Sequence, residues 1–310
     1  MMTIYQLTIR NIKMFFKDKG MVFASMITPI ILLILYATFL ASVYENIFVA
    51  ALKEYNFEIS KKLLDGIIGG EIASSLLAVV PITVAFCSNV LMVQDKVSGA
   101  YKDISVTPVK KAYVSIAYYL GSFFTTIIIS FGALVACFLF LLIKGWYLTL
   151  GDVLRIVLDV FLLGMFGTAI ASIVNSFLST NGQASAVGTA VSAGYGFICG
   201  AYMPIAGFHE ILQTILAFLP GTYGTVLLRN HFMGSTFSVL AKDLEKMMPV
   251  ENAVAVVDGI KDDVDCSILF FGKMVSQPVM YVILTVAILV LIGGYILINV
   301  LKKRRWKNEL

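Results

Sequence analysis

Residues 72–93 read IASSLLAVVPITVAFCSNVLMV, and this run from Ile72 to Val93 contains no Asp, Glu, Lys or Arg. A helix of about 20 mostly apolar residues crosses a hydrocarbon core of roughly 30 Å, so the run predicts a membrane-spanning helix. The rest of the chain has the same character, since 59% of its 310 residues are hydrophobic and only 14% are charged. A single soluble core cannot bury so much apolar surface, and we expect lipid to solvate the remainder.

Five further stretches have the length of a span, which predicts an all-α polytopic membrane protein with six transmembrane helices in one domain, residues 1–310. The predicted spans are Met21–Val43, Ile72–Val93, Ala112–Ile143, Val153–Phe177, Ala184–Met203 and Pro278–Leu301. The third is longer than a perpendicular crossing requires, so it has to tilt or project into water. No cleavage pattern follows the first, which predicts a span rather than a cleaved signal peptide.

Basic residues cluster beside the span ends in three places. They are Arg10, Lys13, Lys17 and Lys19, then Lys96, Lys102, Lys110 and Lys111, and finally Lys302, Lys303, Arg304, Arg305 and Lys307. Cytoplasmic segments carry an excess of Lys and Arg, so we expect a cell-membrane protein with both termini in the cytoplasm. This positive charge suits anionic lipid rather than nucleic acid.

Residues 1–20 have apolar side chains at helical spacing with basic residues between them. The apolar set is Ile4, Leu7, Ile9, Ile12, Phe15 and Phe16. The spacing predicts an amphipathic helix on the cytoplasmic membrane surface. A plain extension of the first span is the alternative.

Residues 204–277 are predicted on the outer face. Their first part, Pro204–Leu228, is weakly apolar and broken by prolines and glycines, which suits a re-entrant segment buried against protein. The alternative is a seventh span over Ile211–Leu228, but Pro220 would break its centre. The second part, Asn230–Gln277, is acidic and is expected to form an outer loop. Its charge fits either a binding role or simple exposure outside the membrane.

Motifs of enzymatic chemistry are absent, since the sequence has no Walker A loop, HExxH, GxSxG or CxxC pair. We therefore expect no catalytic residue and no cofactor bound by this chain, with energy supplied by a partner or an ion gradient. Neither disulfides nor a metal site is expected, because three cysteines lie in apolar runs, Cys266 has no partner in its polar loop, and His209 and His231 lack ligand spacing.

A short polar segment, residues 94–111, follows the second span and begins QDKVSGAYKDISVTPVK. Gly99 allows a turn, and Pro108 ends a helix because the residue before a proline avoids the α region. We expect a short cytoplasmic helix between them. Because long apolar spans flank the segment, a force on it would pass directly into the second and third spans.

This arrangement resembles the type-2 permeases of ATP-binding-cassette (ABC) exporters, in which an acid–base pair and a glycine lead through a short coupling helix to Thr-Pro. The candidate coupling residues are Asp95, Lys96, Gly99, Tyr101, Lys102, Thr107 and Pro108. The family's outer re-entrant turn is similar to the segments containing Pro204, Pro220, Gly221 and Tyr223, although Leu219 and Gly221 stand where Asn and Leu are usual.

The resemblance implies a permease subunit that moves an amphipathic or hydrophobic substrate outward, such as a drug, lipid, peptide or glycolipid. It implies a second permease copy or homologue, and separate cytoplasmic ATPase subunits that bind ATP and Mg²⁺. The coupling helix would occupy a cleft of the ATPase, with polar contacts from Asp95, Lys96 and Lys102. The N-terminal helix would brace the outside of that cleft.

Several polar or small residues within the spans are further candidates. Those of the fifth span, which fit either close packing or a translocation path, are Gly188, Ser192, Gly196 and Gly200. Asp159, four residues after Arg155, is either a functional intramembrane group or half of an interfacial ion pair at the outer surface, and the pair is the favoured interpretation. Asn89 and Asn175 are placed to cross-link helices.

Two other functions remain open. A gradient-driven secondary transporter would need inverted repeats and intramembrane ionisable groups, of which Asp159 is nearly the only candidate. An ATPase-coupled signalling or mechanical transmitter would use Asn230–Gln277 to contact an extracellular partner, and nothing would cross the membrane.

Overall fold

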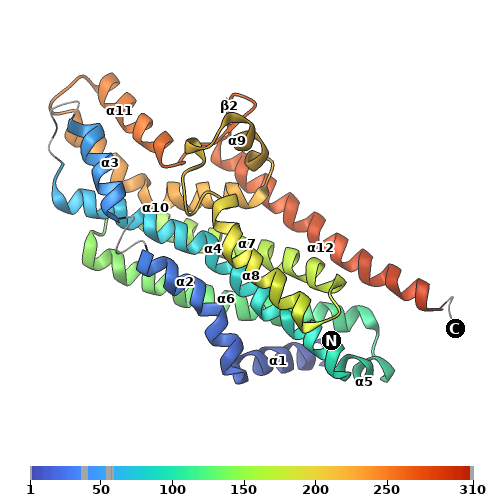
Figure 1. The fold of residues 1–310 in the computed structure, drawn as a ribbon. Coiled ribbons are helices and arrows are strands. Elements are labelled where there is room, and N and C mark those ends of the chain that lie inside the picture. The colour runs from blue at the N-terminus through green and yellow to red at the C-terminus, as the bar shows by residue number, and fades with distance from the viewer. Residues whose placement is uncertain (1, 36–40, 54–56, 58, 308–310) are drawn as a thin grey trace.

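The computed structural model describes residues 2–35, 41–53, 57 and 59–307 (Figure 1). Its α-helices are α1 Met2–Lys17, α2 Lys19–Leu35, α3 Ala41–Lys53, α4 Lys61–Ser98, α5 Ala100–Val106, α6 Lys111–Lys144, α7 Leu150–Phe177, α8 Asn181–Ile198, α9 Glu210–Ala217, α10 Pro220–Leu244, α11 Val250–Asp263 and α12 Gln277–Lys307. A 3-10 turn, η2, covers Ile205–Gly207, and strands β1 (Leu269–Phe270) and β2 (Lys273–Met274) pair antiparallel.

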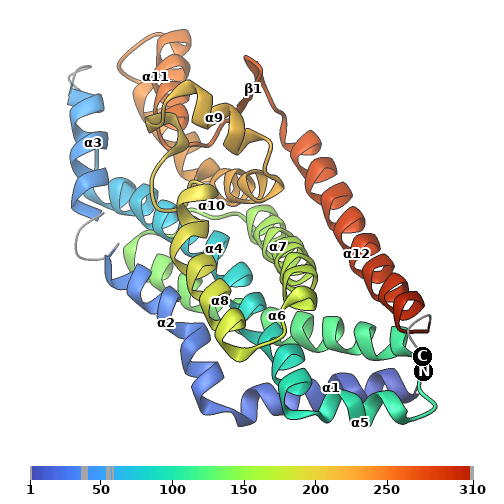
Figure 2. The same cartoon turned by 45° about the vertical axis from the view of Figure 1, so that its right-hand side comes forward.

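Helix α4 is the centre of the bundle, with α2, α6, α7, α8 and α10 packed around it (Figures 1 and 2). It begins at the N-cap Ser60, whose hydroxyl accepts from the backbone N–H of Leu63, and it ends at the left-handed Gly99. Its side chains are buried on almost every face from Leu63 to Val93. A helix that is apolar all round belongs in such a central position.

The two ends of the bundle differ in composition. Figures 1 and 2 place α1, α5 and the last turns of α12 at one end, and α3, α9, α11 and the β1–β2 hairpin at the other. The helices that carry the three basic clusters therefore lie at the same end of the bundle. This agrees with the prediction that the clusters share one side of the membrane.

Four of the described helices are long and apolar enough to cross a membrane, namely α4, α6, α7 and α12, and a fifth span results if the bent pair α9–α10 is counted as one. The protein is thus a multi-pass, all-α membrane protein, while the count of six spans stays a prediction. Of the other two predicted spans, α2 has a shorter apolar stretch over Lys19–Ile31, and α8 begins with the polar sequence NGQAS.

The predicted first span, Met21–Val43, falls on two helices of the described chain. Helix α2 ends at Leu35, residues 36–40 of the predicted span lie outside the described part of the chain, and a separate helix, α3, begins at Ala41. Helix α4 begins at Lys61, well before Ile72. Two charged residues of this first part have partners that the local sequence does not reveal, since Asp65 lies 3.9 Å from Lys144 and Glu71 is paired with Arg229.

The predicted acidic loop Asn230–Gln277 is also corrected. Helix α10 continues through it to Leu244, with most side chains buried, and Cys266 is buried rather than exposed in a polar loop. The predicted break before Pro220 is present, since α9 and α10 meet there at 93° and Pro220 is the first residue of α10. Proline suits that position because its missing N–H would have no helical partner.

Close backbone contact between α4 and α7 depends on Gly167. A Cβ atom there would lie 2.8 Å from Cδ1 and 3.0 Å from Cα of Ile82, and 3.1 Å from the carbonyl oxygen of Pro81. Because two of these neighbours are backbone atoms, the helices would have to separate to admit even a methyl group.

We predict that Gly167→Ala lowers the thermal unfolding midpoint in detergent, by an amount equivalent to about 1–3 kcal/mol, because overpacking forces α7 away from α4. The matched control is Gly132→Ala in α6, where an added Cβ meets nothing within 4 Å. This control should unfold at or slightly above the wild-type midpoint, since alanine favours a helix over glycine. Equal midpoints for the two variants would contradict the close contact.

Candidate functional site

The segment between α4 and α6 turns back on itself and forms the short helix α5. Gly99 makes the turn with φ +87° and ψ −11°, and a Cβ there would meet nothing within 4 Å, so the backbone conformation alone favours glycine. Thr107 ends α5 by donating its hydroxyl to the carbonyl oxygen of Ile104 at 2.6 Å. Pro108 follows, and α6 begins at Lys111.

Asp95, one turn before the end of α4, is held by two other helices. Arg10 of α1 donates both terminal nitrogens to the carboxylate, with Nη2 at 2.9 Å from Oδ1, and Tyr118 of α6 donates its hydroxyl to Oδ2 at 2.5 Å. The Asp95 side chain is only 4% exposed. Hydrogen bonding to Asp95 raises the pKa of Arg10 above its ordinary value.

Lys96 joins the end of α4 to the end of α7. Its Nζ donates to the carbonyl oxygens of Asn175, Ser176 and Leu178 at 3.1–3.2 Å. Those carbonyls are among the last of α7, where a helix leaves acceptors unpaired and where a positive charge is favoured. Lys96 therefore acts as a C-terminal cap on α7.

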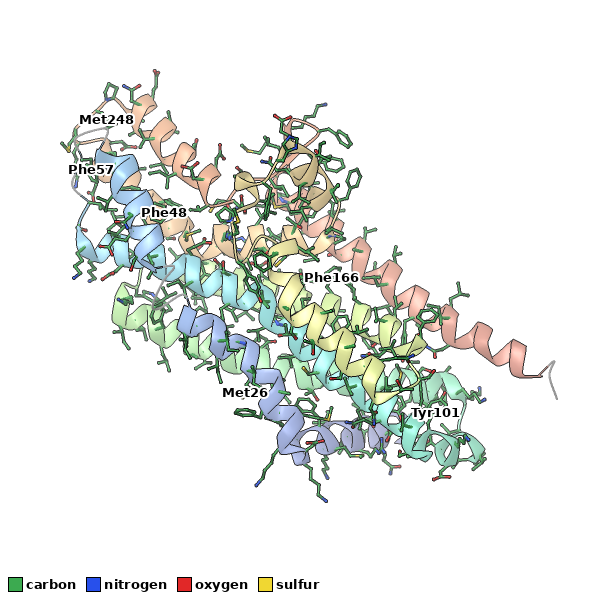
Figure 3. The ribbon with its side chains drawn as sticks, in the orientation of Figure 1. Met26, Phe48, Phe57, Tyr101, Phe166 and Met248 are labelled. Atoms are coloured by element: carbon green, nitrogen blue, oxygen red, sulfur yellow. The ribbon has the colours of Figure 1, made fainter. Side chains whose placement is uncertain are left out.

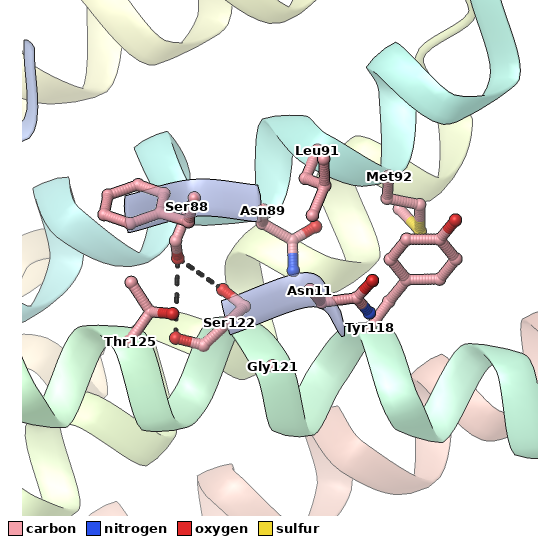
Figure 4. Close-up of a pocket in the computed structure, with 10 residues that line it drawn as sticks. Asn11, Ser88, Asn89, Leu91, Met92, Tyr118, Gly121, Ser122 and Thr125 are labelled. Atoms are coloured by element: carbon pink, nitrogen blue, oxygen red, sulfur yellow. Dashed lines mark hydrogen bonds between the residues drawn. The ribbon is translucent and has the colours of Figure 1, made fainter. Parts of the chain in front are cut away.

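A polar seam continues from this site into the bundle. Asn89 accepts from Asn175 at 3.4 Å and donates to Ser172 at 2.9 Å, which confirms that the two asparagines cross-link α4 and α7. Beside Asn89, the hydroxyls of Ser88 and Ser122 lie 2.6 Å apart. Figure 4 shows the small cavity next to them, which has a volume of about 10 Å³, is lined by residues of α1, α4 and α6, and has room for one water molecule.

Apart from Gly99, which makes the turn, the coupling residues predicted from the sequence fall into two groups. Asp95, Lys96 and Tyr101 contact the chain itself, and Tyr101, labelled in Figure 3, stacks on Tyr118 with ring centroids 6.4 Å apart. The exposed group consists of Lys102, Thr107 and Pro108, together with Asp103 and Val106. The carboxylate of Asp95 and the amine of Lys96 are occupied by internal partners, so the expected polar contacts of these two residues with an ATPase have no support in the structure.

The outer turn residues lie in two places. Pro220, Gly221 and Tyr223 form the α9–α10 corner, where the Tyr223 hydroxyl donates to the carbonyl oxygen of Ala217 at 2.6 Å. Pro204 lies apart from them, at the start of η2. The corner is therefore a packed structural turn, fixed by hydrogen bonds within the outer segment.

The small residues of α8 have different environments. An added Cβ would overlap the Tyr202 ring at Gly196 and would approach Ile205 at Gly200, which also has φ +77°. Ser192 accepts from the Tyr202 hydroxyl through its carbonyl oxygen at 3.2 Å. At Gly188 an added Cβ meets nothing within 4 Å. Gly196 and Gly200 are thus required for packing, which explains them without a translocation path.

A buried arginine network at the end of the bundle opposite α5 was not predicted from the sequence. Arg229 of α10 is fully buried and donates to Glu71 of α4 at 2.8 Å, to Asp265 at 3.1 Å and to the carbonyl oxygen of Gly200 at 2.7 Å. Asp265 also accepts from the backbone N–H groups of Ile205 and Ala206. The network joins α4, α10, the end of α8 and the segment after α11.

The favoured interpretation of Asp159 was wrong. Its carboxylate is buried and contacts His231 of α10 at 2.5 Å and the hydroxyl of Tyr281 of α12 at 2.7 Å. Arg155 instead lies 3.9 Å from Asp152 and is largely exposed. The Asp159 cluster therefore ties α7 to α10 and α12 inside the bundle.

A bundle of membrane-length helices, with a short polar helix folded back at the end where the basic clusters gather, defines a multi-pass helical membrane protein. Residues 52–295 match the family model described as ABC-2 family transporter protein. Because the match covers most of the chain, the protein belongs to the ABC-2 transporter family, whose members are the permease components of ABC transporters and associate with ABC ATPases. A comparison with curated proteins finds no match to the chain. Helices α1 and α2 precede the matched residues.

We predict that Arg10 and Asp95 are energetically coupled. In a double-mutant cycle of Arg10→Ala and Asp95→Ala, unfolding should reveal a coupling energy of about 1–3 kcal/mol, the range of residues in direct contact. The control cycle combines Arg10→Ala with Asp103→Ala, which removes an exposed carboxylate of α5. That cycle should be additive within about 0.5 kcal/mol. Equal coupling in the two cycles would contradict the assigned pairing.

We also predict that Arg229→Met destabilises the protein by about 3–5 kcal/mol, since it leaves two buried carboxylates without their cation. The same change at exposed Arg155 should have little effect. If Arg229→Met fails to accumulate, adding Glu71→Gln and Asp265→Asn should restore folded protein, because the triple variant removes the unpaired charges as well. A triple variant no better than Arg229→Met would show that the network is not the cause.

Proposed function

We propose that this chain is the permease subunit of an ABC exporter, in which a separate cytoplasmic ATPase receives α5 in a cleft and drives an amphipathic or hydrophobic substrate outward. The observation that supports the proposal most strongly is the division of α5 and its flanks into an exposed group around Lys102 and an internal group around Asp95. The exposed group lies on the surface of the segment, and the internal group fastens the segment to the bundle.

The proposed route of force follows those internal contacts. A push on α5 enters α4 directly through Gly99 and enters α6 through Pro108. It also reaches α1 and α7, because Arg10 of α1 donates to Asp95 of α4 and Lys96 of α4 donates to the end of α7. Four helices would therefore move together when an ATPase closes on α5.

The proposed orientation places α1, α5 and the end of α12 in the cytoplasm of a cell-membrane protein. The concentration of Lys and Arg at that end supports it. A second permease, identical or homologous, would complete the transporter, and the α5 helices of the pair would engage two ATPase subunits that bind ATP and Mg²⁺.

One observation favours a second candidate function, a gradient-driven transporter. The Asp159–His231–Tyr281 cluster is a set of buried titratable groups within the bundle, and such groups mark ion pathways in many membrane proteins. The family membership favours ATP-driven transport over this alternative.

We predict that Lys102→Glu abolishes productive docking of the ATPase while leaving the permease folded, because it reverses a charge on the exposed face of α5. Co-purification of the ATPase should fall by at least about tenfold, equivalent to about 1.4 kcal/mol. The matched control is Lys242→Glu, another exposed lysine, in α10 near the opposite end. Undiminished co-purification and ATP hydrolysis for Lys102→Glu, at an unchanged unfolding midpoint, would reject α5 as the docking element.

A further inference from the structure

A cavity of about 150 Å³, far larger than the one in Figure 4, lies at the end of the bundle opposite α5. We name it the hairpin cavity. Ile205, Val226 and Ile268 line it with buried apolar side chains, and Leu269 and Met274 of the β1–β2 hairpin line it with exposed ones. In another protein, an engineered apolar cavity of about 150 Å³ binds benzene. The hairpin cavity therefore has room for an apolar group the size of one ring.

Four polar side chains complete the lining of the hairpin cavity, namely Gln213, Asp262, Asp265 and Ser267. Asp265 follows the end of α11 with φ +52°, a left-handed conformation that aspartate tolerates better than most residues. The turn brings its buried carboxylate to Arg229, at 3.1 Å, and to the backbone N–H of Ala206, at 3.0 Å. One polar group of the lining is thus fixed by the arginine network.

The side-chain hydrogen-bond donors of this polar lining are already in use. Nε2 of Gln213 donates to the carbonyl oxygens of Ala206 at 3.1 Å and Phe208 at 2.8 Å, which uses both of its hydrogens. Ser267 donates its hydroxyl to Oδ1 of Asp262. Ionised carboxylates can only accept. The polar lining therefore offers acceptors, and it fits a group that donates and does not need to accept.

The charges around the hairpin cavity favour a positive group. Asp262 is exposed, and in the described part of the chain its Oδ2 has no hydrogen-bond partner, while neighbouring Lys261 is paired with Asp258 at 2.9 Å. Burial raises the pKa of Asp265, because apolar surroundings disfavour its negative charge. A cation in the cavity would offset that cost. An ammonium group has three donors and no acceptor, so it matches both the charge and the hydrogen bonding of the lining.

We propose that the hairpin cavity binds a small organic ammonium ion, with its apolar group against Val226 and Ile268 and its ammonium group donating to Asp262. An anion of the same shape would be repelled by the carboxylates. A neutral molecule of the same shape would keep the apolar contact and lose the attraction between charges. This inference is independent of the ATPase and of the proposed transport function.

The test compares the binding of benzylamine, a cation at neutral pH, with that of benzyl alcohol, a neutral molecule of nearly the same shape. The full-length protein is placed in phosphatidylcholine nanodiscs, and binding is followed by saturation-transfer difference NMR after subtraction of the signal from empty nanodiscs. Asp262→Asn removes the charge, and Asp263→Asn, at the adjacent exposed position, is its matched control. Ala206→Phe fills the cavity from an exposed position, with Ala255→Phe on the exposed side of α11 as its control.

We expect saturable binding of benzylamine that Asp262→Asn weakens about threefold or more, within the range of exposed ion pairs, and that Ala206→Phe abolishes. The two control variants should bind as the wild type does. Equal affinities for benzylamine and benzyl alcohol, or an unchanged affinity in Asp262→Asn, would overturn the proposal. Binding that survives in Ala206→Phe would also overturn it, because the ligand would then lie elsewhere. If Ala206→Phe does not fold, the comparison of Asp262→Asn with Asp263→Asn decides the question.

Discussion

A charge buried in this bundle has to be paired inside it, because an isolated carboxylate or guanidinium in apolar surroundings costs several kcal/mol. The central helix α4 meets this requirement near both ends. Glu71 is paired with Arg229 in its N-terminal half, and Asp95 is paired with Arg10 and Tyr118 near its C-terminus. Between these two anchors α4 is buried on nearly every face, so its position is fixed by charge at its ends and by close packing along its length.

These anchors give the proposed mechanism a physical path. From Asp95 to Glu71 the helix rises about 36 Å, at 1.5 Å per residue. In the proposed mechanism a displacement of α5 would enter this helix at Gly99 and reach the arginine network, where Arg229 connects α4 to α10 and, through Asp265, to the backbone of η2. Glu71 and Asp95 are thus the two points at which motion of α4 would be transferred to neighbouring elements.

The sequence predicted those features that local patterns determine. Long apolar runs predicted most boundaries of α6, α7 and α12 to within a few residues. Gly99 and Pro108 correctly predicted where α5 begins and ends. Local patterns could not predict pairs of residues that are distant in the sequence. Arg10 and Asp95 are 85 positions apart, and Asp159 lies 72 positions from His231. The i−4 rule assigned Asp159 to Arg155 because only neighbours on one helix were visible. Helix α10 was cut short for the same reason, since Arg229 and His231 look like loop residues until their buried partners are known.

The central claim is that the segment from Gln94 to Pro108 faces the cytoplasm and receives the ATPase there. The most direct measurement is labelling of Lys102→Cys, in a background without native cysteines, by a membrane-impermeant maleimide in intact cells and in inside-out vesicles. We expect labelling only in inside-out vesicles, protected when the ATPase is bound, with the opposite pattern for Lys246→Cys at the outer end. Labelling of Lys102→Cys from outside intact cells would contradict the proposed coupling.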